Sequence, residues 1–307
     1  YSVNIETVGW GSEGRMVLRE IGQTLEQAGA SVNTWIPSAT VEQLKKAPAA
    51  QLNLVKRVRW ARRMKELFGT DYLHMNDSGR YVGLDGISCF YRDVAEKLGL
   101  REPMEQVICR ETARVEEQTR QAKAFIRQHR GVLILRGLQS VPFTLKTYAK
   151  ELGLPIDTVC VCQTERMKIT AGMTPEIEAN LMDRIRQAID LFSPGTQVLV
   201  NPEEEILRER LRQVDCIVGT EDITMEGLGA PLIPAVDRLS GPSYDSYICM
   251  VNRFSECLRT AMPRDELVLS RMEFSTDDYP RYGNPSTSGA RQMWERMWLD
   301  RRKGEQA

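Results

Sequence analysis

The stretch that decides the fold is Gly131-Val132-Leu133-Ile134-Leu135, with Arg136-Gly137 directly after it. The first five residues predict a β-strand, because a short unbroken apolar run is typical of a buried strand. If the neighbouring strands run parallel to it, Arg136 and Gly137 lie at the carboxyl edge of a sheet. That edge is where open α/β sheets bind ligands.

The chain on both sides of this strand alternates between helical and strand patterns. After it we predict strands and helices at 141–152, 156–161, 175–192, 197–200, 203–211, 216–218 and 244–260. Before it we predict them at 2–8, 12–28, 32–36, 40–47, 52–55, 56–68, 72–75 and 85–98. Such alternation predicts parallel strands joined by crossover helices. The predicted fold class is α/β, with repeated Rossmann-like lobes whose parallel sheets are flanked by helices, plus a C-terminal helical tail.

The predicted domains follow from this repetition. They are a first Rossmann-like lobe at 1–101, a helical connector at 102–130, a second Rossmann-like lobe at 131–261, and a C-terminal tail and helix at 262–307. The alternative for 102–130 is a solvated helix with alternating charges. Within the first lobe, Thr40 and Gln43 predict a capping box, and Gly29 and Gly69 predict helix ends.

Composition narrows the classes of function. The 307 residues contain 41 basic and 42 acidic side chains, a formal charge of −1, which disfavours nonspecific binding to nucleic acid or an anionic membrane. No apolar run approaches the ~20 residues that span a bilayer, and no signal-peptide pattern opens the chain. Seven cysteines, an odd number, do not resemble a disulfide framework. We therefore expect a cytoplasmic protein with reduced thiols.

Few residues indicate chemistry by themselves. Arg136 is placed to hold a carboxylate or an anionic cluster, and a surface ion pair is the alternative. Cys160 and Cys162 form a C-x-C pair at the end of the next strand, either as metal ligands or as buried small side chains. The two histidines lie far apart, so we assign no catalytic residue. The segment 9–14 is either a tight turn or an anion-binding turn.

Three stretches of the sequence resemble one family, the component 1 (MoFe-protein-like) subunits of nitrogenase and nitrogenase-like reductases. The first comprises 1–5 (YSVNI), 39–44 (ATVEQL) and 47–55 (APAAQLNLV). The second comprises 68–72 (FGTDY) and 83–98. The third comprises 215–219 (DCIVG), 228–232 (LGAPL) and 239–242 (LSGP). Their order and spacing are similar to those of the family over about residues 1–260.

The sequence also departs from the family pattern. The family's catalytic subunit holds its iron–molybdenum cofactor with a cysteine just after the strand that resembles Leu52–Val55, and Lys56-Arg57-Val58-Arg59 stands there instead. The family's second cofactor ligand, a histidine before S-G-P, has no counterpart in Pro234-Ala235-Val236-Asp237. The family's first α/β lobe, which brings the ligands of an intersubunit cluster, is also unmatched. We expect either a fragment of a longer chain or a reduced relative, and we disfavour dinitrogen as substrate.

The resemblance implies further roles. It implies that Arg136, Gly137, Gln139 and Arg57 line a pocket, and that Cys160 and Cys162 are the candidate metal ligands. The cofactor would be an iron–sulfur cluster or related metallocluster, held here, at a subunit interface or in a partner. The implied partners are a homologous component 1 subunit in an α2β2 assembly and an ATP-dependent iron–sulfur reductase, with ATP bound only by that reductase.

The main functional hypothesis is a subunit of a nitrogenase-like oxidoreductase that reduces a tetrapyrrole or an alkyl sulfide. The alternatives are a scaffold subunit for assembly of a nitrogenase-type metallocluster and a metal-free, two-lobed α/β small-molecule binder. The first predicts turnover, the second predicts transfer of metal to an acceptor protein, and the third predicts a colourless protein.

Overall fold

The structure is a computed structural model that describes residues 1–7, 12–75, 80–219, 232–234 and 242–260. The chain divides into two compact units. The first unit comprises Tyr1–Lys123 and Val236–Arg253, and the second unit comprises Ala124–Ala235 and Phe254–Ala307. The domain boundaries proposed from the sequence stay a prediction.

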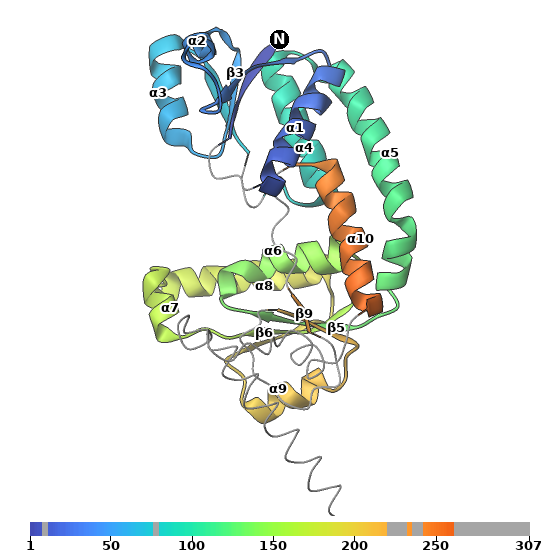
Figure 1. Cartoon of the computed structure of the whole chain (residues 1–307). Helices are drawn as coiled ribbons and strands as arrows, with labels where there is room; N and C mark the ends of the chain where they lie inside the picture. The colour runs from blue at the N-terminus through green and yellow to red at the C-terminus, as the bar shows by residue number, and fades with distance from the viewer. Residues whose placement is uncertain (8–11, 76–79, 220–231, 235–241, 261–307) are drawn as a thin grey trace, which may run out of the picture. The chain divides into compact units, whose positions relative to one another are not determined.

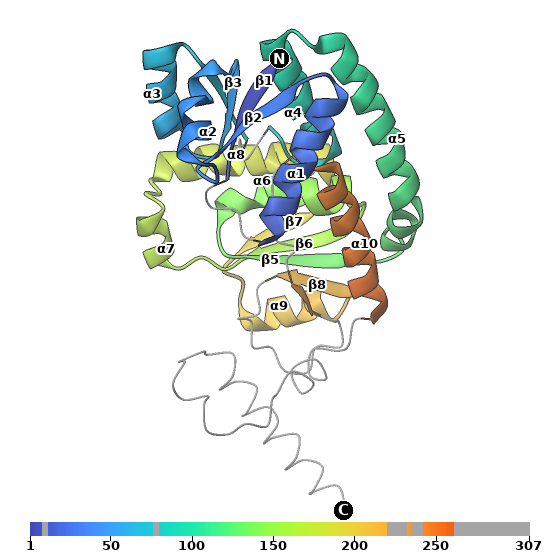
Figure 2. The same cartoon turned by 45° about the horizontal axis from the view of Figure 1, so that its top comes forward.

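The first unit contains a parallel sheet of four strands in the order β2-β1-β3-β4. The strands are β1 (Ser2–Glu6), β2 (Ser31–Ile36), β3 (Leu52–Val55) and β4 (Asp71–His74). Figures 1 and 2 show α1 (Ser12–Gln27) and α4 (Gly83–Leu98) on one face of this sheet. The short helix α2 (Val41–Lys45), the 3-10 turn Ala47–Ala49 and α3 (Val58–Phe68) lie on the other.

Three asparagines lie side by side on neighbouring strands of this sheet. Asn33 donates to Asn4 Oδ1 at 2.9 Å, and Asn4 donates to Asn53 Oδ1 and to the Ala47 carbonyl, both at 2.8 Å. The side chains therefore form a row across β2, β1 and β3. Because a slip of one residue would break this row, it fixes the register of the three strands.

The predicted helix signals are present. Thr40 and Gln43 form the capping box, with each side chain bound to the other residue's backbone N–H. Gly69 ends α3 and Gly99 ends α4, with φ of 76° and 75°. Gly29, after α1, has φ of 89°. Left-handed residues of this kind are the usual ends of helices, and glycine adopts them without strain.

Two long helices run across the division between the units. α5 (Arg101–Ile126) is a single helix where one was predicted over 102–130. It is not solvated all round, because Met104, Val115 and Ile126 are fully buried. The other is α10 (Tyr244–Thr260), as predicted.

The second unit contains a parallel sheet of five strands in the order β7-β6-β5-β8-β9. The strands are β5 (Gly131–Leu135), β6 (Ile156–Val161), β7 (Gln197–Val200), β8 (Cys216–Gly219) and β9 (Leu232–Pro234). β5, β6 and β7 have the predicted bounds. β9 was not predicted, since three residues carry too little pattern to mark a strand.

Helices cover both faces of this second sheet. Figures 1 and 2 show α6 (Val141–Leu145) and α8 (Pro175–Phe192) on one face and α9 (Glu204–Leu211) on the other. The helix predicted at 141–152 is instead α6 followed by a π-helix at Lys146–Glu151. The hydroxyls of Thr144 and Thr147 donate to carbonyls four residues earlier, a contact that bends helices. The short α7 (Glu165–Thr170) was missed.

Two parallel sheets flanked by helices confirm the α/β class with repeated Rossmann-like lobes. The predicted tail at 262–307, residues 9–11 of the turn at 9–14 and the segment 235–241 lie outside the described residues. None of the described helices is long and apolar enough to cross a bilayer.

Candidate functional site

The candidate site of the second unit lies where its strand order reverses. β5 is followed along the chain by β6 on one side, while β8 pairs with β5 on the other. In open parallel sheets, ligands bind outside the carboxyl ends of the strands at such a point. Arg136 and Gly137 follow β5 directly, and Gly219 is the last residue of β8. The structure thus places two predicted pocket residues at the expected edge.

Gly137 and Gln139 are in close contact at this edge. Gly137 is buried and extended, with φ of 172° and ψ of 144°. A Cβ atom added to it would lie 2.8 Å from Gln139 Oε1, so the Gln139 side chain lies directly over the glycine. Arg136 and Gln139 are both exposed. Three of the four predicted pocket residues therefore lie at one edge of this sheet.

Cys160 and Cys162 lie on the α9 face of the same sheet. Cys160 is fully buried in an apolar cluster with Val132, Ile134 and Ile217, and Cys162 packs against that cluster. The Cys162 N–H donates to the Leu135 carbonyl at 2.8 Å, which keeps the strand extended. The two side chains therefore point the same way, as residues two apart on a strand do.

These surroundings favour thiols over thiolates. Burial raises the pKa of Cys160 to about 12, and the nearby Cys162 adds to the effect. Burial also raises the pKa of Cys162. Thiolate is the form that binds metals, so the surroundings favour the packing alternative. Among the residues that the structure describes, no three His, Cys, Asp or Glu side chains are grouped to hold a metal. A ligand role for the pair stays a prediction that requires ligands from elsewhere.

The fourth predicted pocket residue, Arg57, belongs to the first unit. The order β2-β1-β3-β4 reverses between β1 and β3, and Arg57 follows β3 as the exposed N-cap residue of α3. Like Arg136, it stands at the carboxyl edge of a parallel sheet at its switch point.

Glu6 is the residue at this switch point that the sequence reading missed. Its side chain is 1% exposed at the end of β1. Oε2 accepts the N–H groups of Lys56 at 2.7 Å and Arg57 at 2.8 Å. His74 Nε2 lies 2.9 Å from the Lys56 carbonyl on the other side. The N–H groups of Lys56 and Arg57 could bind an external anion, but the Glu6 carboxylate already accepts both of them. A glutamate at the end of the predicted strand is the only signal in the sequence.

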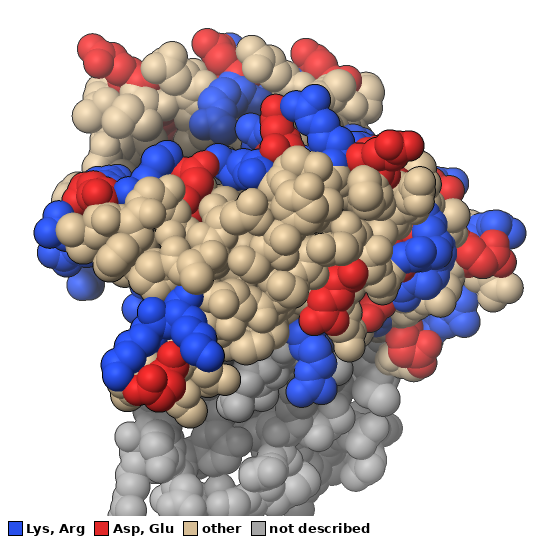
Figure 3. Space-filling view, turned by 90° about the horizontal axis from the view of Figure 1, so that it is seen from above, with Lys and Arg blue, Asp and Glu red and all other residues tan. Residues whose placement is uncertain are grey.

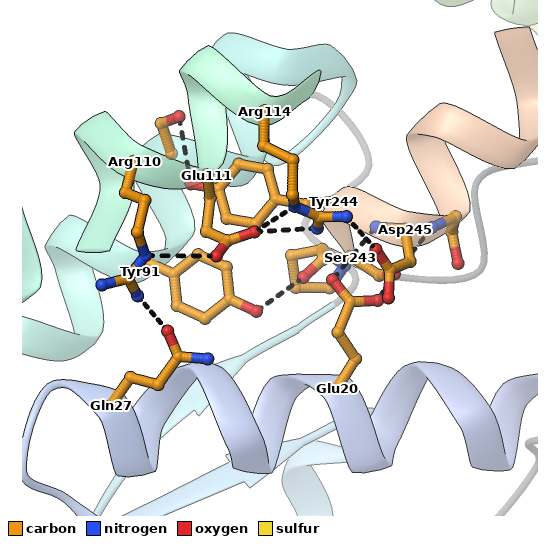
Figure 4. Close-up of polar contacts among 12 residues, drawn as sticks. Glu20, Gln27, Tyr91, Arg110, Glu111, Arg114, Ser243, Tyr244 and Asp245 are labelled. Atoms are coloured by element: carbon orange, nitrogen blue, oxygen red, sulfur yellow. Dashed lines mark hydrogen bonds and ion pairs between the residues drawn. The ribbon is translucent and has the colours of Figure 1, made fainter. Parts of the chain in front are cut away.

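The start of α10 is held by a network within the first unit (Figure 4). Glu20 of α1 accepts a hydrogen bond from the Ser243 hydroxyl and another from the Asp245 N–H at 3.1 Å. Burial raises the pKa of Glu20, and the Ser243 hydrogen bond partly opposes that rise. The carboxylate thus caps the helix that follows the S-G-P motif.

The network continues into α5. Arg114 pairs with Asp245 at 2.7 Å and with Glu111 at 2.8 Å. Tyr91 stacks on Tyr244 with ring centroids 5.5 Å apart, and its hydroxyl donates to the Pro242 carbonyl at 3.2 Å. The residues on each side of the N-terminus of α10 are therefore held by α1, α4 and α5.

Comparisons with known proteins agree with this architecture. The family model described as nitrogenase component 1 type oxidoreductase matches residues 11–249. The solved structures of nitrogenase Cp1 at pH 5 and pH 6.5 are each 18% identical and cover 85% of this chain, with TM-scores of 0.52 and 0.51. This chain covers 57% and 58% of those chains, less than two thirds of their length.

Another match is weaker. A periplasmic metal binding protein from candidatus liberibacter asiaticus is 12% identical, with a TM-score of 0.40, covering 84% of this chain and 100% of that chain. None of the curated protein sequences gives a match. Because the family model spans most of the sequence, the chain belongs to the nitrogenase component 1 type oxidoreductase family.

Proposed function

We propose that the chain is one subunit of a nitrogenase-like oxidoreductase complex that reduces a small organic molecule. Membership of the component 1 family is the observation that carries this proposal. Electrons would come from an ATP-dependent iron–sulfur reductase that docks on the complex. The second subunit would be a homologous component 1 chain in an α2β2 assembly, located in the cytoplasm.

The carboxyl edge of the second sheet supports binding of a small molecule. In the second unit, Arg136, Gly137 and Gln139 combine a cation, a position without a side chain and a carboxamide at the switch point. In the first unit, considered separately, Arg57 stands at the equivalent edge of its own sheet. Guanidinium groups bind carboxylates through paired hydrogen bonds, so Arg136 would orient an acidic group of a substrate.

The residues after β3 argue against dinitrogen. In the resemblance drawn above, the family's cofactor cysteine stands where this chain has Lys56 and Arg57. Here the N–H groups of both residues are bound to Glu6, and the first cysteine of the sequence is Cys89. A tetrapyrrole or an alkyl sulfide is therefore the proposed class of substrate.

A metallocluster implied by the family does not fit the described residues of this chain alone. The two candidate thiols are buried among apolar side chains, and the described residues hold no other group of ligands beside them. When bound, such a cluster would store the electrons for reduction. We therefore place it at a subunit interface or in the partner.

The test is anaerobic purification of the chain with its co-expressed homologous partner, followed by iron and acid-labile sulfide analysis. We expect several irons per complex and oxidation of the reductase that depends on both ATP and substrate. A colourless, metal-free monomer that never oxidises the reductase would overturn the proposal.

The second candidate function is a metal-free small-molecule binder. The burial of Cys160 in an apolar cluster favours it. It predicts binding of an organic ligand in air with no dependence on the reductase. Ligand-induced thermal stabilisation of the chain alone would separate this function from the first.

A further inference from the structure

Gln163 lies at the same sheet edge as Arg136 and Gly137. The hydrogen bond from the Cys162 N–H to the Leu135 carbonyl extends the pairing of β5 and β6 beyond their last strand residues. Gln163 comes one residue later. Since Cys160 and Cys162 face α9, the alternation of a strand directs Gln163 toward the face that α6 and α8 cover.

The backbone of Gln163 is fixed from the other side by Asn201, just after β7. The Gln163 N–H donates to Asn201 Oδ1 at 2.7 Å, and Asn201 Nδ2 donates to the Gln163 carbonyl at 2.9 Å. Asn201 adopts a φ of 47° to make this pair, a conformation that asparagine tolerates better than most residues. The strand end is thus held in one position, as a binding residue requires.

The side chain of Gln163 is 5% exposed, yet its Oε1 atom has no hydrogen-bond partner in the part of the chain that the structure describes. A buried acceptor without a donor lowers stability, because it has lost its hydrogen bonds to water. An apolar side chain of similar volume would avoid that cost. A polar atom at such a place calls for an explanation, such as a ligand or a water that pairs with it.

We propose that Gln163 is a specificity-determining residue whose carboxamide accepts a hydrogen bond from an N–H or O–H group of a molecule bound beside Arg136 and Gly137. The ligand class is an organic acid that also carries such a donor. Arg136 would bind its carboxylate, and rotation of the carboxamide about its soft terminal torsion would bring the acceptor to the donor. The inference rests on the proposed site at the end of β5.

The experiment measures the affinity of three probes of matched length for the full chain by ligand-observed NMR titration. Butyrate carries only a carboxylate, butyramide only an amide, and succinamate both. We expect succinamate to bind about fivefold more tightly than butyrate, the value of one net hydrogen bond. Gln163→Leu should abolish this preference, and Gln163→Met serves as a second apolar replacement. Arg136→Gln should weaken both acids and keep their ratio.

The melting temperatures of the same variants separate a binding role of Gln163 from a purely structural one. Gln163→Leu should melt at or above the wild-type temperature, because it removes an unsatisfied acceptor. Gln213→Leu, an exposed glutamine just before β8 at the opposite edge, is the matched control and should leave the probe affinities unchanged.

Wild-type protein without a preference for succinamate would overturn the proposal. So would a lower melting temperature of Gln163→Leu with an unchanged probe ratio, which would mean that the oxygen is satisfied inside the fold, for example by a trapped water. The assay needs neither reductase nor ATP. The two claims can therefore fail separately. If the complex reduces nothing but the chain still prefers succinamate, the proposed function is refuted and this inference stands.

Discussion

Cys160 and Cys109 differ in how far solvent reaches their thiol groups. Cys160 is fully buried with a pKa of about 12, whereas Cys109 on α5 is exposed. We expect a thiol reagent at pH 8 to modify Cys109 and the exposed Cys249 rapidly and to leave Cys160 intact until the chain unfolds. Mass spectrometry of the labelled peptides measures this. Equal labelling of Cys160 and Cys109 in the native chain would contradict the buried placement.

Gly137 and Gly219 stand at the same switch point but differ in what surrounds them. A Cβ at Gly137 would approach the flexible end of Gln139, while a Cβ at Gly219 would lie 2.8 Å from the backbone oxygen of Ile134. Gly137→Ala should therefore change the free energy of unfolding by less than about 1 kcal/mol, and Gly219→Ala should lower it by about 1–3 kcal/mol. Denaturant titrations compare them. Equal losses would show that the Gln139 side chain is not free to move.

At the scale of elements, β4 is tied to the helices on both sides of it by Asp71. Lys65 of α3 and Lys97 of α4 both donate to this carboxylate, at 2.7 and 2.5 Å. Burial alone would raise the pKa of Asp71, but the two lysines outweigh it and hold the pKa at about 2. Because the folded pKa is lowered from 3.8, the stabilisation is present above that value and disappears as the pH falls toward 2.

Asp71→Asn should therefore lower the free energy of unfolding at pH 7 by about 0.5–1 kcal/mol, a value discounted because solvent screens these partly exposed charges. The difference from wild type should vanish near pH 2. Urea titrations across this range measure it. Asp183→Asn, which breaks an exposed pair with Arg186, is the control and should have almost no effect. A pH-independent difference would contradict the ionic explanation.

The N-terminus of α10 depends on the carboxylate of Glu20. Glu20→Ala removes the acceptor for Ser243 and Asp245 and should cost about 1–3 kcal/mol. Glu20→Gln keeps an acceptor and removes the charge whose pKa burial raises. A folded pKa above 4.5 means that ionisation costs stability at neutral pH and that the cost is relieved as the pH falls toward 4.5.

Relative to wild type, Glu20→Gln should therefore be at least as stable at pH 7, with the two converging near pH 4.5. Thermal melts at several pH values provide the measurement. A Glu20→Gln variant as unstable as Glu20→Ala would indicate that the charge itself holds the helix.

Elements with strong local patterns were predictable from the sequence, and tertiary contacts were not. The bounds of β5, β6 and α8 match the prediction because apolar runs and Pro175 mark them. β9 was missed because its three residues form a strand only through pairing with β8.

The same distinction applies to the candidate site. Arg136 and Gly137 were predictable because each follows a recognisable strand. Glu6 and Gln163 were not, because their roles depend on partners 38 to 51 residues away. Whether Gln139 and Arg57 contact a ligand stays a prediction.

At the scale of the whole molecule, charge is balanced. The formal charge is −1, and Figure 3 shows basic and acidic side chains interspersed on the face in view. Binding to nucleic acid depends on clustered cations that displace counterions. We expect no binding of a fluorescent 30-base-pair duplex at micromolar protein, about 0.15 M salt, by anisotropy. Saturable binding that weakens with added salt would contradict this.

Glu6 bears on how readily this fold could acquire a new ligand. Its carboxylate satisfies the N–H groups of Lys56 and Arg57, so the turn after β3 contains its own anion. A single codon change to a shorter residue would leave two parallel donors open at a switch point, beside an arginine. In evolutionary terms, Glu6 fills from within the chain the place that a bound anion would take at this turn.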